Sequence, residues 1–193
     1  RFRDYVRFAL ARKDSEAHRA AVAFWDERLA SLPPAPELPL AHRPSEVRVQ
    51  HVSALTFRLP HADWTSLRGR LQRHGLTEAA FLLAVYAEAI GAFSASPRFT
   101  LNVPVLGREP VHPHVHHAVG NFSTCVLISV DVSERGGVLA RAKSVQRQLM
   151  DAVSNARGAG VRLLRKLATQ AGGTQGGTMP VVFTHFPAGI DGW

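Results

Sequence analysis

Two segments with alternating apolar residues, at 98–107 and 119–133, constrain the fold of this chain more than any other feature. The apolar positions of both segments follow a period of two: Phe99, Leu101, Val103 and Val105 in the first, and Phe122, Val126, Ile128, Val130 and Val132 in the second. This alternation predicts two half-buried strands. The loop between them, REPVHPHVHHA at 108–118, is rich in His, Arg and Pro, which contribute little to packing. Functional residues commonly lie on loops held by a rigid sheet, so we expect function here.

The remaining chain predicts helices interleaved with short strands. Apolar residues at helical spacing predict helices at 2–12, 15–32, 61–74, 78–93, 137–156 and 160–170. Ser15 and Thr77 are expected N-caps, and Gly75 is expected at the C′ position of the third helix. The helix that follows Thr77 is apolar nearly all round, which predicts that it is buried.

Two further strands are expected at 47–59 and 179–186, where apolar and polar residues alternate again. A proline-rich segment at 33–46 suits neither helix nor central strand, and we expect it to bridge the surface in an extended form. AGGTQGGT at 171–178 lacks the Lys of a P-loop and is expected to be a flexible loop. Together these elements predict one α/β domain over 1–193, built as a two-layer sandwich.

The composition places the chain in a reducing compartment. Its single cysteine, Cys125, excludes an internal disulfide, and we expect a cytoplasmic protein. No apolar run approaches the roughly 18 residues of a membrane span, and the charged first residues do not resemble a signal peptide. The sequence does not begin with Met, which suggests a piece of a longer protein.

Two binding functions are less favoured by the charge pattern. The net charge of +8 is spread singly along helix faces without a nucleic-acid-binding motif, so an acidic protein partner is the better interpretation. The cluster His112, His114, His116 and His117 offers imidazoles for zinc, but its spacing alternates faces and no Cys or acidic ligand is adjacent. We favour a solvated loop over a metal site.

Six segments, in order, resemble motifs of one family. They are FRDYV at 2–6, FWDERL at 24–29 with LPPAPELPL at 32–40, LTEAAFLLAVYAEAIGAFS at 76–94, TLNVPVLGREPVHP at 100–113, VGNFSTCVLISVD at 119–131 and MPVVFTHF at 179–186. The chain thus resembles the C-terminal half of a heterocyclization domain of nonribosomal peptide synthetases, a branch of the condensation-domain family. That resemblance implies one lobe of a chloramphenicol-acetyltransferase-like fold. HHAVGNF at 116–122 is similar to the HHxxxDG motif of condensation enzymes, but Asn121 and Phe122 replace its Asp and Gly, so we treat this match as accidental.

The resemblance implies an enzyme that condenses a carrier-bound acyl group with a carrier-bound Cys, Ser or Thr and then cyclodehydrates the product to a thiazoline or oxazoline. Such enzymes serve siderophore and peptide natural product biosynthesis. The implied catalytic residues are Asn102 and Thr184, and the implied substrate-binding residues are Arg108, His112, Asn121, Ser123 and His185. The implied partners are peptidyl or aryl carrier domains, a neighbouring adenylation domain and the N-terminal lobe. No cofactor is expected to bind directly, because substrates arrive on the phosphopantetheine of carrier proteins.

The chain also departs from the family motifs. Asn121 stands in place of Asp, Ser123 in place of Thr, His185 in place of Ser, and Gly107 in place of Asn. The DxxxxD motif belongs to the N-terminal half, and a further Asp would follow Trp193, so the isolated fragment is expected to be inactive. Two alternatives remain open: an amide-forming condensation domain without cyclisation, and a degenerate domain that only docks carrier proteins.

Overall fold

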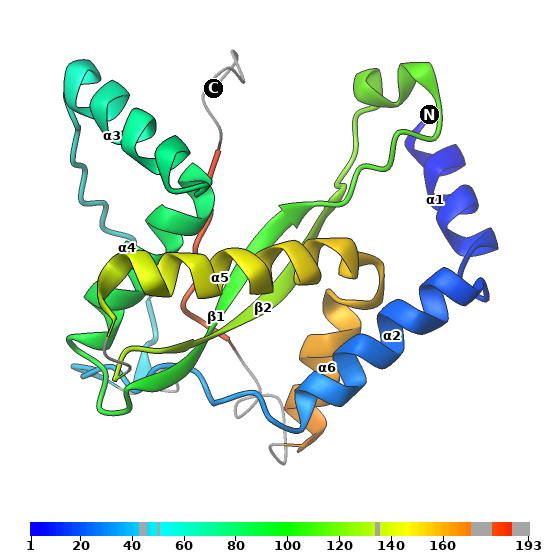
Figure 1. Cartoon of the computed structure of the whole chain (residues 1–193). Helices are drawn as coiled ribbons and strands as arrows, with labels where there is room; N and C mark the ends of the chain where they lie inside the picture. The colour runs from blue at the N-terminus through cyan, green and yellow to red at the C-terminus, as the bar shows by residue number, and fades with distance from the viewer. Residues whose placement is uncertain (43–45, 50, 134–135, 171–178, 187–193) are drawn as a thin grey trace.

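The computed structural model describes residues 1–42, 46–49, 51–133, 136–170 and 179–186. The glycine-rich stretch at 171–178, predicted as a loop, lies outside these residues. The elements are, in chain order, α1 (Phe2–Ala11), α2 (Glu16–Leu29), α3 (His61–Arg73), α4 (Glu78–Gly91), β1 (Arg98–Leu106), η2 (Pro113–His117), β2 (Ser123–Asp131), α5 (Gly137–Ser154), η3 (Ala156–Gly158) and α6 (Val161–Gln170). This α/β arrangement agrees with the fold class predicted from the sequence (Figure 1).

The two predicted central strands are confirmed. β1 and β2 pair antiparallel, from Arg98 opposite Asp131 to Leu106 opposite Ser123. The predicted strand at 179–186 is confirmed only in part, because it forms a single parallel bridge, between Val182 and Asn102 of β1. In that bridge the Asn102 N–H donates to the Val181 carbonyl at 3.1 Å. The Asn102 carbonyl accepts from the Phe183 N–H at 2.9 Å.

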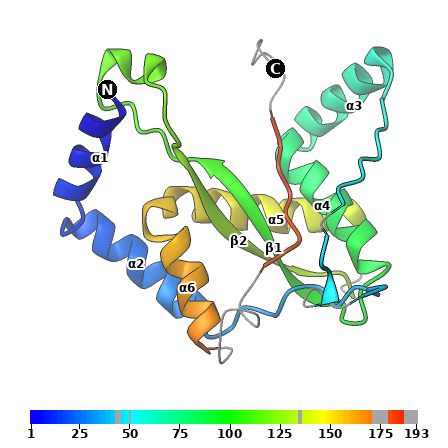
Figure 2. The ribbon, with the colours of Figure 1, turned by 180° about the vertical axis from the view of Figure 1, so that it is seen from behind.

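Helices and the proline-rich segment close the sheet. α5 crosses one face of the β1–β2 pair, while residues 179–186 run along the edge of β1 that faces away from β2 (Figures 1 and 2). The prediction of a half-buried first strand was wrong, because both faces of β1 are covered in its middle and Thr100 and Asn102 are buried. The Thr100 N–H and hydroxyl donate to the carbonyls of Pro34 and Pro33, at 2.8 and 2.6 Å. The extended proline-rich segment therefore protects part of the β1 edge.

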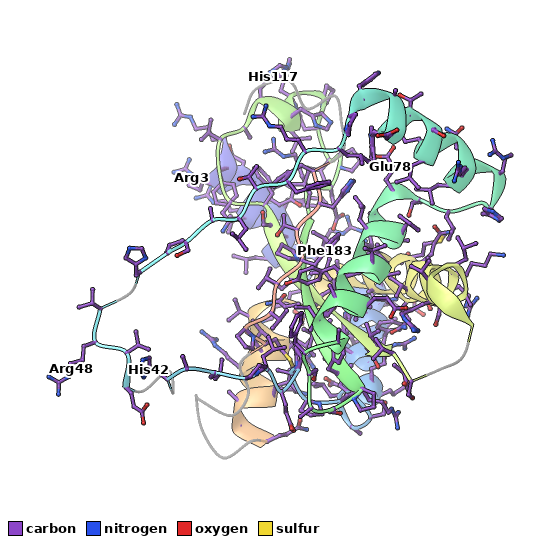
Figure 3. All side chains as sticks on the ribbon, turned by 90° about the vertical axis from the view of Figure 1, so that its left-hand side faces the viewer. Arg3, His42, Arg48, Glu78, His117 and Phe183 are labelled. Atoms are coloured by element: carbon purple, nitrogen blue, oxygen red, sulfur yellow. The ribbon has the colours of Figure 1, made fainter. Side chains whose placement is uncertain are left out.

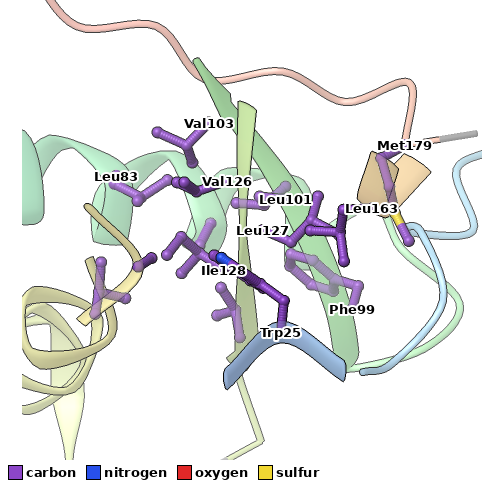
Figure 4. Close-up of a cluster of buried hydrophobic side chains, with 14 of the residues drawn as sticks. Trp25, Leu83, Phe99, Leu101, Val103, Val126, Leu127, Ile128, Leu163 and Met179 are labelled. Atoms are coloured by element: carbon purple, nitrogen blue, oxygen red, sulfur yellow. The ribbon is translucent and has the colours of Figure 1, made fainter. Parts of the chain in front are cut away.

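The buried core joins both strands to residues from distant helices (Figure 4). Its largest fully buried side chains are Trp25, Phe99, Leu83, Leu101, Ile128 and Leu163. The Trp25 indole N–H donates to the Asn155 carbonyl at 2.9 Å, which fixes α2 against the end of α5. Burial of these apolar surfaces is the main stabilising contribution, at roughly 25 cal/mol per Å².

The helix boundaries follow the predicted signals. The hydroxyls of Ser15 and Thr77 each accept a bond from an N–H three residues later, at 3.2 Å. Gly75 adopts φ +65°, the left-handed conformation expected of a C′ residue. α4 is less enclosed than predicted: its residues Ala80, Leu83, Ala84 and Ala87 are buried, but Val85 is 42% exposed.

The strand predicted at 47–59 was wrong. Residues 51–59 are extended without any strand pairing, and the side chains of Leu55 and Phe57 are 103% and 87% exposed. In the segment just before it, His42 and Arg48 stand away from the packed body (Figure 3). A strand is stable only when a neighbour satisfies its backbone groups. Among the described residues no backbone partner exists for 51–59.

Candidate functional site

The β1–β2 loop is fastened to α1 by a single hydroxyl group. Tyr5 lies on α1 and donates to the Gly107 carbonyl at 2.5 Å, while its oxygen accepts from the Glu109 N–H at 3.0 Å. These two partners flank Arg108, so Tyr5 fixes the backbone on both sides of that residue. Tyr5 comes from the FRDYV segment and Arg108 from the loop motif. Two segments about a hundred residues apart in the chain therefore form one structural unit.

Aromatic packing around Phe122 completes this unit. The Phe122 ring meets the rings of Phe2 and Tyr5 edge to face, with centroids 5.0 and 4.7 Å apart. The guanidinium carbon of Arg108 lies 3.9 Å from the centroid of Phe122, a cation–π contact. Gly120 leaves room for Phe2, because a Cβ added there would lie 2.1 Å from the Phe2 Cδ2 atom. Only glycine fits this position without moving the Phe2 ring.

Several predicted substrate-binding residues shape the loop itself. The Arg108 guanidinium donates to the carbonyls of Val115, His116 and Ala118, at 2.7, 3.0 and 3.2 Å. Two further bonds are short-range. In the loop His112 Nδ1 accepts from the His114 N–H at 3.1 Å, and at the start of β2 Asn121 Oδ1 accepts from the Ser123 N–H at 2.9 Å. Asn121 thus supplies the oxygen acceptor that an Asp would supply at the same atom.

A cavity of about 460 Å³ lies between α1, the loop and the α5–η3 connection. Glu109 lines this cavity, with its carboxylate 3.2 Å from the Arg12 guanidinium and 3.8 Å from that of Arg157. Glu109 and Tyr5 were not predicted from the sequence as residues of this region. The acidic residue inside an Arg- and His-rich loop was the available signal for Glu109, whereas nothing local indicates the partners of Tyr5.

The predicted catalytic residues Asn102 and Thr184 lie on neighbouring segments. Bridge partners in a sheet present their side chains on the same face, and side chains alternate along a strand. Asn102 and Val182 therefore share one face of the sheet, and Thr184 lies on the same side of the C-terminal segment as Val182, since half-buried and exposed residues continue to alternate over 181–186. The Asn102 amide nitrogen donates to the Met179 carbonyl at 3.4 Å, while its buried Oδ1 has no hydrogen-bond partner among the described residues. Thr184 is exposed, and its hydroxyl makes no hydrogen bond within the described chain.

His185 lies on the opposite face from Thr184 and separately from the loop. It lines a hollow of about 510 Å³ between α3 and α4, together with Thr77 and with Arg68 and Glu78, which form an ion pair at 2.6 Å. Arg108 follows Asn102 by six residues, a distance of up to roughly 20 Å along an extended strand. The predicted site residues thus fall into four groups: Arg108 and His112 in the loop, Asn121 and Ser123 at the start of β2, Asn102 and Thr184 near the β1 bridge, and His185 beside α3.

Among the described residues, no group of three or more His, Cys, Asp or Glu side chains is arranged to hold a metal ion. In the same part of the chain, no helix combines the length and apolar character needed to cross a membrane.

Comparison with known proteins identifies the family. Residues 1–181 match the family described as Condensation domain. The chain belongs to the condensation-domain family. Among solved condensation-domain relatives, the EpoB NRPS cyclization-docking bidomain from Sorangium cellulosum superposes with a TM-score of 0.83 at 39% identity, over 95% of this chain and 37% of that chain.

Sequence relatives of this condensation-domain chain include synthetases of larger size. Pyochelin synthetase PchF from Pseudomonas aeruginosa is 38% identical over 95% of this chain and 10% of its own length. Phenyloxazoline synthase MbtB from Mycolicibacterium paratuberculosis is 36% identical over 83% of this chain and 13% of its own length. The chain therefore spans about a tenth of these relatives.

Proposed function

We propose that this chain is part of a heterocyclization domain, as the C-terminal lobe over residues 1–193. Its parent would condense a carrier-bound acyl group with carrier-bound Cys, Ser or Thr and cyclodehydrate the product. Similarity to a cyclization bidomain and to a phenyloxazoline synthase supports this choice over amide formation alone. Phosphopantetheine on the carriers would deliver the substrates, with an adenylation domain and an N-terminal lobe as neighbours in a cytoplasmic synthetase.

The observation that carries the proposal is the shared face of Asn102 and Thr184. The two polar groups come from separate motifs, and within the described part of the chain each keeps unused hydrogen-bonding capacity: the Asn102 Oδ1 atom as an acceptor and the Thr184 hydroxyl as a donor or acceptor. A buried polar oxygen without a partner has a free-energy cost, and binding of a substrate donor removes that cost.

These two groups suit cyclodehydration. The substrate's thiol or hydroxyl attacks the new amide carbon, which forms a C–S or C–O bond and converts the carbonyl oxygen to a hydroxyl group. The C–O bond to that hydroxyl then breaks, the amide nitrogen loses its proton, and a C=N bond forms with release of water. Asn102 Oδ1 would accept from the amide N–H and orient it, and the Thr184 hydroxyl would donate to the departing oxygen.

The test uses the full-length synthetase with Thr184→Val, which keeps the side-chain shape and removes the hydroxyl. Condensation should continue while dehydration stalls, so uncyclised amide or hydroxylated ring accumulates on the carrier. Mass spectrometry separates these species from the finished ring by the mass of one water. Thr65→Val, an exposed helical position on α3, is the matched control and should behave as wild type.

Asn102→Ala provides a second arm. Among the described residues the Oδ1 atom makes no hydrogen bond and the amide nitrogen makes one long bond, so the melting temperature should change little. Cyclised product should fall much more than stability. Dehydrated ring formed at the parental rate by both variants would refute the proposal and favour a condensation or docking role.

A further inference from the structure

We propose that Pro104 ends the pairing between β1 and the C-terminal segment, and thereby sets how firmly Thr184 is held for dehydration. Pro104 is a positioning residue in this account, since it acts through the backbone beside Thr184. The inference rests on the proposed role of Thr184, and it deepens that role by identifying what controls the hydroxyl's placement.

The edge of β1 that faces away from β2 determines which backbone groups can pair with the C-terminal segment. Alternate residues of a strand direct their N–H and C=O groups to the same neighbour. On β1 the residues that face away from β2 are Thr100, Asn102 and Pro104, because Asn102 bonds to the C-terminal segment and the alternation continues on either side. The Thr100 N–H is used by Pro34, and both backbone groups of Asn102 are used by Val181 and Phe183.

Pro104 lacks the backbone donor that would continue this pairing. Continuing the parallel ladder would require an N–H at position 104 to donate to the Phe183 carbonyl and the Pro104 carbonyl to accept from the His185 N–H. Proline has no N–H, so the first of these bonds cannot form. The second is not formed either: no backbone bond joins Pro104 to His185 in the described chain, and the pairing consists of the one bridge at Val182.

The end of the pairing affects how firmly Thr184 is held. Phe183 is the last residue of the described chain whose backbone bonds to β1, and its ring lies 5.6 Å from that of Tyr86. Beyond it, Thr184 is exposed and Phe186 is 70% exposed. The catalytic hydroxyl is therefore attached immediately after the end of the ladder. A reacting group that is less well fixed is less effective, because orientation is part of the catalytic advantage.

Restoring a donor at position 104 should extend the ladder. Pro104→Thr introduces an N–H and a β-branched residue suited to a strand. The new backbone bond should slow amide hydrogen exchange in residues 181–186 by about fivefold, the effect expected of one net hydrogen bond. With Thr184 held more firmly, the ratio of dehydrated ring to uncyclised product on the carrier should rise by up to the same factor.

The experiment compares full-length synthetases by hydrogen exchange and by mass spectrometry of carrier-bound products. Pro104→Ala restores the N–H without the β-branched side chain and remains available if Pro104→Thr folds poorly. Pro97→Ala makes the same replacement at an exposed site just before β1, outside the ladder, and should leave both readouts at wild-type values.

Slower exchange together with a higher ring ratio in the Pro104 variants supports the inference. Unchanged exchange in 181–186 overturns it, whatever the products. Slower exchange with an unchanged ratio also overturns it, since the position of Thr184 would then not limit dehydration. Failure of the proposed function is recognised separately, by a Thr184→Val enzyme that completes the ring at the parental rate.

Discussion

Replacing Tyr5 with Phe removes one hydroxyl group that joins α1 to the residues on both sides of Arg108. The Gly107 carbonyl and the Glu109 N–H each lose a partner, from bonds of 2.5 and 3.0 Å. Each lost net hydrogen bond costs about 1 kcal/mol, and both sites are only partly buried, so water replaces part of the loss. We expect about 1–2 kcal/mol in the local stability of the loop, while the ring contacts with Phe122 remain.

Amide hydrogen exchange of residues 107–122 in the full-length protein measures this change directly. A loss of 1–2 kcal/mol corresponds to roughly 5- to 30-fold more frequent opening. The chain offers a matched control in Tyr86, its other tyrosine. Burial raises the pKa of Tyr86, and its hydroxyl makes no hydrogen bond among the described residues. Tyr86→Phe should leave the loop unchanged.

The reasoning is refuted if loop exchange in Tyr5→Phe rises no more than in Tyr86→Phe. A second check is Arg108→Lys, which keeps the charge but cannot reproduce a planar guanidinium that reaches three carbonyls over Phe122. It should also accelerate exchange in the loop. If Tyr5 and Arg108 hold the same unit, the effects of the two substitutions should be less than additive when combined.

Two other predictions follow from exposed surfaces and charges. The isolated 193-residue chain should bind hydrophobic dyes or aggregate, because Val52, Leu55 and Phe57 are 87–103% exposed; a cooperative monomeric melting transition would contradict this. Hydrogen bonds from Lys166 and then Arg162 lower the pKa of Asp26 below 3.8 despite partial burial. Since the pKa is lower in the folded state, this contribution is present at neutral pH and is lost as the pH falls through the folded value. Asp26→Asn should loosen α6 by at most about 1 kcal/mol, measured as faster exchange of residues 161–170 in low salt, and the effect should shrink in high salt.

Local signals in the sequence were sufficient for the helices and for the central strands. Thr77 and Gly75 mark boundaries through backbone bonds and φ angles that depend only on nearby residues. The period-two pattern located β1 and β2 because each finds its partner within the described chain. The strand prediction from the same pattern at 47–59 was wrong. Alternation shows only that side chains can lie on two faces, whereas a strand also requires a neighbouring backbone to pair with.

The candidate site was predictable only as a set of residues. The order of the motifs indicated Asn102 and Thr184 as site residues. The bridge between Asn102 and Val182 brings the segments that carry them side by side. The contacts of Arg108 were not predictable, since a guanidinium in a loop has the same sequence pattern whether it meets a substrate or three carbonyls of its own loop. The role of Pro104 was not predictable either, because the effect of a missing N–H depends on which edge of the strand it faces.

The contact between Gly120 and Phe2 has a consequence for recombining condensation-domain proteins. A junction placed between α1 and β1 would take the Phe2 ring from one parent and position 120 from the other, although the two are separated by more than half of the chain. Any parent with a side chain at 120 would drive its Cβ into that ring. Hybrids should therefore inherit residues 2–5 and 107–122 from the same source, and crossover points belong outside this pair of segments.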